Sequence, residues 1–538
     1  MGSIRRVEQR FPTRQYGHRY AADAGFGADV ALTSGETYRF ITGRDLVPVP
    51  IGADEPGTPR DLFAAEILFG GEPPPLSLRA LQRRLNGIGG PGALPVERSF
   101  VVGDGGQIPW TPDTDDLERS FRLIVTRHRS AAVEPDLLVS ASTDIDSETN
   151  FLQVICWDAE TGAYQFYDRR DQVWFWAGSS WDALEPDARG KGPFDSHVNG
   201  ALNMKELKAP WVHWHSQASA IRDEVLAPVD PLRNEPLWTG KSQAEVFERS
   251  IARPGIDRWT NARVGRCIRG QRLTRLPEFM RQVLETTTIN LAASPVSSAR
   301  LPTADAVPLP LTFFLHADAL IETLDLDLAA ALPPLDAEVY RELLRRYDVH
   351  VTDKGRHRIP GDTHFLFVVP EPAYEDLTVL QALLDRGVLS DRLAAALLMV
   401  DFCNAVYSRR RAALLRYAPA EAALDDAERF AAEFIARVEA SPEAADASSA
   451  EAELLANWRT GHDWRTACAE RIGEFLAAVA ARFRSVDDFT PVFALADSRR
   501  REFRMSKLAE FKLTTPYSNL PDRPLLEFTS DGGVRPKP

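Results

Sequence analysis

A series of short apolar segments between residues 99 and 178 constrains the fold of this 538-residue chain more than any other feature. The segments are rich in β-branched and aromatic residues and are bounded by turn residues, as is typical of strands. They are SFVV (99–102), FRLIVTRH (121–128), LLVSAS (137–142), FLQVICW (151–157), AYQFYD (163–168) and VWFWAG (173–178). Because the connections are short, as at residues 158–162, the sequence predicts an antiparallel meander without βαβ units.

The rest of the chain contains a Pro- and Gly-rich N-terminal segment and a C-terminal part with helical patterns. Ser77 and Gly87 bracket a short helix at residues 78–86, within an otherwise Pro- and Gly-rich segment. Beyond residue 370 the apolar residues follow helical spacing, with one helix expected at 375–386 and a long one at 391–416. These patterns predict an α+β fold, with an antiparallel, β-rich N-terminal and central part and a helical C-terminal part.

The length exceeds what one hydrophobic core usually supports. We expect an extended wrapping segment with short helices at 1–98, a β-rich core at 99–370, a helical part at 371–515 and a partly disordered tail at 516–538. The four cysteines are far apart in apolar surroundings, so we expect buried, reduced thiols.

Charge and hydropathy narrow the classes of function. The net charge of -14 disfavours nucleic-acid binding, which depends on Lys and Arg neutralising phosphates. No window approaches eighteen uninterrupted apolar residues, so no membrane span is expected. The first residues are basic but lack the apolar core of a secretory signal, which favours a cytoplasmic location.

The segment from residue 151 to 216 carries the chemically distinctive residues, including six of the eleven tryptophans. Its end reads Pro-Trp-Val-His-Trp-His-Ser from residue 210. In an extended strand residues i and i+2 point to the same side, so Trp211, His213 and His215 would share one face. Two imidazoles so placed can bind one transition-metal ion such as iron, copper or zinc. Asp195 and His197, a second i, i+2 pair, are the nearest candidates for further ligands or for acid–base partners.

The leading hypothesis is therefore a metal-dependent enzyme, an oxidoreductase acting on a small apolar or aromatic molecule. The metal ligands would be His213, His215 and His197, the catalytic pair would be Asp195 and His197, and the substrate pocket would be lined by Trp174, Trp176, Trp211 and Trp214. One alternative is a non-catalytic ligand-binding or assembly protein, in which the tryptophans and histidines fill a core. Another is a metal-independent hydrolase or lyase with His197 or His213 as general base.

Asp401 and Asn404 interrupt an otherwise apolar helical pattern. A buried carboxylate must be paired to offset the cost of its burial. We expect a structural ion pair between Asp401 and Arg409 or Arg410, formed at the helix end or through an intervening group.

Overall fold

The computed structural model of the protein describes residues 32–104, 109–115, 120–131, 134–170, 172–202, 221–296, 300–328, 331–353, 357–361, 366–505, 516–521 and 524–538. Helices and strands are both abundant, which confirms an α+β protein. The chain forms two compact units. Unit 1 comprises residues 1–103, 116–195 and 229–241, and unit 2 comprises residues 104–115, 196–228 and 242–538.

Unit 1 is organised by an eight-stranded sheet with the strand order β2-β1-β8-β7-β6-β5-β4-β3. Strands β4 to β8 form the predicted meander, in which consecutive strands pair antiparallel. Strand β1, however, runs parallel to β8, so the sheet is mixed and the antiparallel prediction is only partly right. The strands are β1 (Thr37–Arg39), β2 (Val49–Ile51), β3 (Val96–Asp104), β4 (Ser120–His128), β5 (Leu137–Ser142), β6 (Leu152–Asp158), β7 (Ala163–Arg170) and β8 (Val173–Ser179).

The parallel pair has a simple cause. The whole meander separates β1 from β8 along the chain, so no hairpin fixes their relative direction. Both β1 and β2 come from the segment expected only to wrap a domain surface. Each of them has only three residues, too few for a recognisable alternation of apolar and polar residues.

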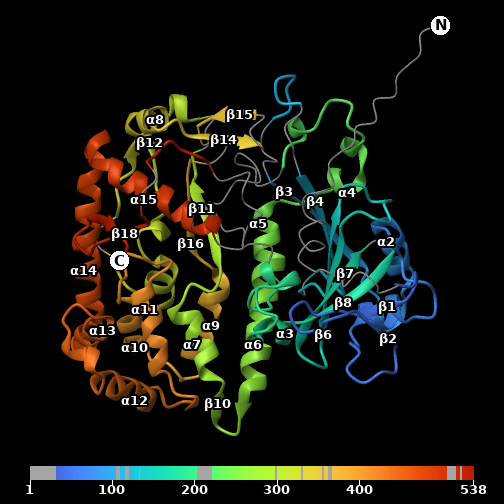
Figure 1. The fold of residues 1–538 in the computed structure, drawn as a ribbon, viewed down its shortest axis with the longest axis horizontal. Coiled ribbons are helices and arrows are strands. Elements are labelled where there is room, and N and C mark those ends of the chain that lie inside the picture. The colour runs from blue at the N-terminus through green and yellow to red at the C-terminus, as the bar shows by residue number, and fades with distance from the viewer. Residues whose placement is uncertain are drawn as a thin grey trace. The chain divides into compact units, whose positions relative to one another are not determined.

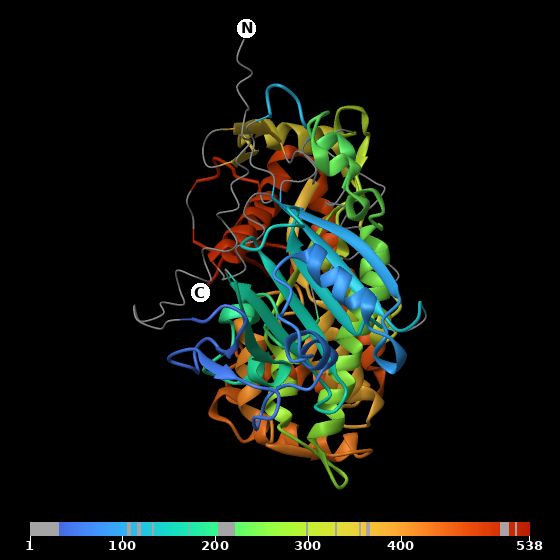
Figure 2. The ribbon, with the colours of Figure 1, turned by 90° about the vertical axis from the view of Figure 1, so that its right-hand side faces the viewer.

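Helix α2 (Leu78–Gly87) lies over one face of the unit 1 sheet (Figure 2). It forms where the sequence predicts it, because the Ser77 hydroxyl accepts the N–H of Ala80 as an N-cap. Its Leu78, Leu81 and Leu85 side chains are buried. The helical turns η1 (Phe63–Leu68), helix α3 (Ser180–Leu184) and helix α4 (Pro236–Thr239) complete the main helical elements of this unit.

Unit 2 is mainly helical around an antiparallel pair, β11 (Ile289–Ser294) and β16 (Leu366–Pro372), as Figure 1 shows. Helix α9 packs against α6 and α7, and α15 packs against β16 and α8. The helices are α5 (Ala244–Phe247), α6 (Arg253–Cys267), α7 (Leu276–Leu284), α8 (Ala337–Arg346), α9 (Tyr374–Asp385), α10 (Asp391–Leu398), α11 (Arg409–Ala413), α12 (Ala427–Glu439), α13 (Ala450–Trp458), α14 (Trp464–Ala480) and α15 (Val486–Met505). Short strands form small sheets: β9 (Ile268–Arg269), β10 (Arg272–Thr274) and β17 (Glu421–Ala423); β12 (Ala306–Val307) and β13 (Leu335–Asp336); β14 (His350–Asp353) and β15 (His357–Pro360).

The end of the chain forms a hairpin, β18 (Leu526–Phe528) and β19 (Val534–Pro536), where the sequence predicts disorder. Phe528 is buried among the rings of Phe313, Phe314 and Phe475. The side-chain amide of Asn404 binds both the N–H and the carbonyl of Phe528, at 2.9 and 3.0 Å. Tertiary contacts therefore order a segment whose composition alone predicts disorder.

All four cysteines are buried and none forms a disulfide, as expected. Among the residues that the structure describes, no helix has both the length and the apolar character needed to cross a membrane.

Candidate functional site

The first turn of helix α9 in unit 2 places two neighbouring acidic side chains in the protein interior. Strand β16 ends at Pro372, and α9 begins at Tyr374 with Glu375 and Asp376 in its first turn. A helix N-terminus favours negative charge. Because α9 packs against α6 and α7, both carboxyl groups are nevertheless buried, and Asp376 is only 7% exposed.

Asp376 is held by neutral donors. Its Oδ1 accepts hydrogen bonds from Gln282 Nε2 at 3.0 Å and from Thr287 Oγ1 at 2.8 Å. The Arg263 guanidinium donates to Gln282 Oε1, so the cation reaches Asp376 only through an amide. Arg263 itself is buried, and its guanidinium lies 4.4 Å from the centroid of the Phe279 ring.

This environment makes Asp376 a titratable group near neutral pH. Burial raises its pKa from 3.8 to about 7, although the hydrogen bonds from Gln282 and Thr287 oppose the rise. Burial also lowers the pKa of Arg263 to about 10, which still leaves the guanidinium charged at pH 7. Asp376 can therefore both give up and accept a proton under ordinary conditions.

His197 belongs to a tight turn in unit 2. The carbonyl of His197 accepts the N–H of Gly200 at 2.9 Å, and Gly200 has a φ of 78°, which favours glycine. The ring Nδ1 lies 2.9 Å from the carbonyl oxygen of Ala201. Because a carbonyl can only accept, Nδ1 carries the hydrogen, and in the neutral ring the lone pair is on Nε2.

The same turn connects to Asp376. Asn199 donates from Nδ2 to Thr287 Oγ1 at 2.8 Å, and that hydroxyl in turn donates to Asp376. The carbonyl of Asn199 accepts the indole N–H of Trp259, which is fully buried in α6. Two hydrogen bonds thus join the His197 turn to the carboxyl group that titrates near neutral pH.

The other residues singled out in the sequence are distributed differently. Asp195 ends the helical turn η3 (Gly192–Asp195) in unit 1, whereas His197 belongs to unit 2. Trp174 and Trp176 lie in β8, and their indole N–H groups bind the Pro75 carbonyl and the Gln165 side chain. Their role in lining a substrate pocket stays a prediction.

His213, His215, Trp211 and Trp214 lie outside the described residues. Within the part of the chain that the structure describes, no group of three or more His, Cys, Asp or Glu side chains is arranged to hold a metal ion. The metal centre expected at residues 197–215 is therefore a prediction that rests on the sequence.

Unit 1 contains a second buried carboxyl group, Asp61, whose surroundings indicate a structural role. Its Oδ1 accepts the N–H groups of Phe63 and Ala64 at the start of η1, and its Oδ2 accepts the hydroxyl of Tyr167. Burial raises the pKa of Asp61 to about 6. Both oxygens serve to anchor η1 on the sheet, which accounts for the residue without any chemistry.

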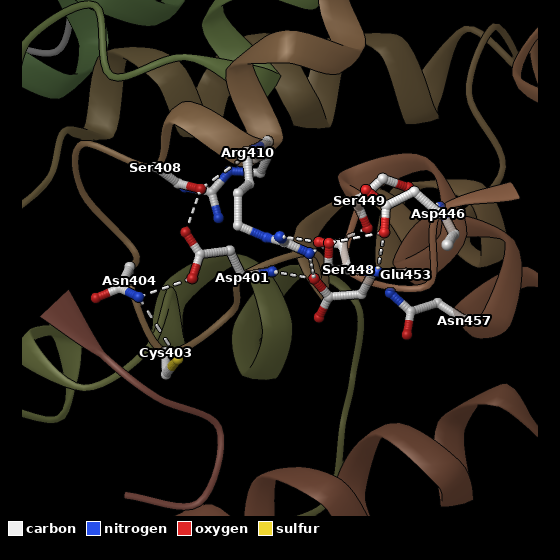
Figure 3. A network of polar contacts seen from close by, with 12 residues as sticks. Asp401, Cys403, Asn404, Ser408, Arg410, Asp446, Ser448, Ser449, Glu453 and Asn457 are labelled. Carbon is white, nitrogen blue, oxygen red and sulfur yellow. Dashed lines mark hydrogen bonds and ion pairs between the residues drawn. The ribbon is translucent and has the colours of Figure 1, made fainter. Parts of the chain in front are cut away.

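Asp401 also has a structural role, although not in the predicted ion pair (Figure 3). The long helix expected at 391–416 is interrupted between α10 and α11, and Asp401 has a φ of 53° in this connection. Its carboxylate accepts from Asn404 Nδ2 at 2.7 Å and Ser408 Oγ at 2.6 Å. Arg410 binds Glu453 at 3.0 Å, and the same Glu453 oxygen accepts the N–H of Asp401.

The interruption has a local cause. Asp, Asn and Ser side chains bind nearby backbone and side-chain groups and so compete with helical hydrogen bonds. Ser408 accepts the N–H of Arg411 and starts the new helix α11. Among the described contacts, Asp401 thus forms no ion pair with Arg409 or Arg410. Its link to Arg410 runs through an intervening group, Glu453.

The sequence contains signals for the residues around Asp376 that were not recognised. The acidic pair at 375–376 opens an otherwise apolar helix, and three consecutive threonines precede the buried strand β11. Asn199-Gly200 is a typical turn pair and begins two residues after His197. Comparison of the chain with protein-family models, with curated proteins and with solved structures found no match.

Proposed function

We propose that the protein is an enzyme that performs acid–base chemistry on a small molecule without a metal, as a hydrolase or lyase, with Asp376 and His197 as its reactive groups. The observation that carries the proposal is the hydrogen-bonded connection between the His197 turn and a buried carboxyl group with a pKa of about 7. Groups that must both hold and release a proton have such pKa values, and perturbed pKa values concentrate at functional sites.

Each residue has a distinct role in this proposal. Asp376 in its protonated form donates a proton to the leaving group, and His197 accepts one through Nε2. Gln282 and Thr287 fix the orientation of the Asp376 carboxyl group through their hydrogen bonds. Burial keeps Asp376 partly protonated at neutral pH, because the charged form is poorly solvated in the interior.

The test uses the purified full-length chain after treatment with a chelator. The chain is assayed against panels of esters, amides and β-substituted carboxylic acids, and the best substrate is followed in three variants. Asp376→Asn and His197→Asn should each lose roughly 100-fold or more in kcat/KM, the usual contribution of general acid–base catalysis. Asp327→Asn, at an exposed site in unit 2, should retain the wild-type rate. Undiminished turnover in both site variants would contradict the proposal.

A transition-metal oxidoreductase is the second candidate. Metal-bound histidines usually donate their other ring N–H to a carbonyl or carboxylate, and His197 Nδ1 has such a partner in the Ala201 carbonyl. In this candidate His197 joins His213 and His215 as ligands of iron, copper or zinc.

Metal analysis and the absorption spectrum of the purified protein distinguish the two candidates. Stoichiometric metal that disappears in His213→Ala and His215→Ala supports the oxidoreductase. A colourless, metal-free protein that stays so after reconstitution rules it out. Ligand binding without turnover in any panel would instead favour the non-catalytic binding protein.

A further inference from the structure

The pairing of β11 with β16 in unit 2 brings Asn290 directly opposite Glu371. Both side chains are buried, with exposed fractions of 1% and 2%. Asn290 Nδ2 donates to Glu371 Oε1 at 2.8 Å, and Thr312 Oγ1 donates to Glu371 Oε2 at 2.5 Å. The carboxylate therefore has two neutral donors.

Glu371 has no positive partner in the described part of the chain, a property that it shares with Asp376. Among the described residues, no Lys, Arg or His lies within ion-pair distance of Glu371. By contrast, Glu451 pairs with Arg416 at 2.6 Å and is buried to a similar degree. Burial of an ionised carboxylate is costly unless an opposite charge compensates it.

The side-chain amide of Asn290 also has an oxygen without a hydrogen bond. Its Oδ1 accepts no hydrogen bond from the described part of the protein, although the side chain is buried. This oxygen belongs to the same amide group whose nitrogen binds Glu371. Turning the amide over would place two oxygen atoms against each other, so the hydrogen bond fixes the orientation.

We propose that Glu371, Asn290 and Thr312 form a binding site for one monovalent metal cation, Na⁺ or K⁺. Oxygen ligands from a carboxylate, an amide and a hydroxyl suit hard cations. A single positive charge neutralises Glu371, whereas a divalent ion would leave an excess charge in the interior. The site is separate from the chemistry proposed for Asp376 and does not depend on it.

The first test is thermal unfolding of the full-length chain in choline chloride, with Na⁺ or K⁺ replacing choline at constant ionic strength. A ligand that binds only the folded state raises the unfolding midpoint with its concentration. We expect a saturable rise for the wild type, none for Glu371→Gln, and a retained rise for the matched control Glu451→Gln. Equal midpoints in all three salts, a response to Mg²⁺ or Ca²⁺ alone, or a retained response in Glu371→Gln would overturn the proposal.

A direct measurement keeps the proposal testable even if Glu371→Gln does not fold. Equilibrium dialysis of the wild-type chain against Na⁺ or K⁺ in choline buffer, followed by elemental analysis, gives the number of bound ions. One ion per chain above the level found with a nonbinding protein of equal charge supports the site. No bound ion at millimolar concentration would refute it.

Discussion

Replacing Asp376 with Asn should change how stability depends on pH. In the unfolded chain this carboxyl group releases its proton near 3.8, whereas in the folded chain it keeps the proton up to about 7. The contribution of Asp376 to the stability of the folded state is therefore fully present below about pH 4, and it is lost as the pH rises to about 7. At 1.36 kcal/mol per pH unit, the loss amounts to roughly 4 kcal/mol.

The D376N variant is neutral at every pH and keeps an oxygen that can accept from Gln282 and Thr287. The free energy of unfolding of D376N minus that of the wild type should therefore increase by roughly 4 kcal/mol between about pH 4 and pH 8. Urea unfolding at constant ionic strength, followed by tryptophan fluorescence and far-ultraviolet circular dichroism, measures this difference. Asp327→Asn, at an exposed position, serves as the control.

The shape of the difference curve is decisive. We expect the difference to be flat below about pH 4, to rise between about pH 4 and pH 7, and to level off above about pH 7. A difference that does not vary with pH, or one that falls as the pH rises, would refute the claim that burial keeps Asp376 protonated.

Three further substitutions test particular contacts. Thr287→Val removes a hydrogen bond that lowers the pKa of Asp376, so that pKa should rise further, as measured by carboxyl-carbon NMR; an unchanged or lower value would contradict the geometry. Tyr167→Phe removes the hydroxyl that donates to the Asp61 carboxyl group at the start of η1. It should lower the free energy of unfolding in urea by roughly 1–3 kcal/mol, and an unchanged transition would show that this hydrogen bond does not anchor η1. Asn404→Ala leaves the buried N–H of Phe528 unpaired, at roughly 1–3 kcal/mol, and leaves its carbonyl with only the weak Cys403 thiol donor. Hydrogen exchange in the C-terminal hairpin should therefore accelerate, and retained protection there would show that the amide does not hold the hairpin.

The sequence predicted elements whose determinants are local. Strands β4 to β8 have apolar patterns and short turns of their own, and α2 has its Ser77 cap, so each could be recognised in isolation. The parallel partner β1 and the hairpin at β18 could not be recognised in this way. Each is short, and each is stabilised by segments more than a hundred residues away.

The same distinction applies to the candidate site. His197 could be singled out because histidine is chemically conspicuous in any sequence. Asp376 could not, because an acid in the first turn of a helix is ordinarily an exposed residue that complements the helix dipole. Only the packing of α6 and α7 against α9 removes it from water and moves its pKa toward neutrality.

The central claim is that Asp376 holds its proton near neutral pH in the folded protein, and a carboxyl-carbon NMR titration tests it most directly. The chain is labelled with ¹³C at aspartate carboxyl groups, and the Asp376 resonance is assigned by its absence in D376N. We expect this resonance to titrate with a pKa of about 7. A resonance that titrates near the ordinary value of about 4 in the folded chain would contradict the account.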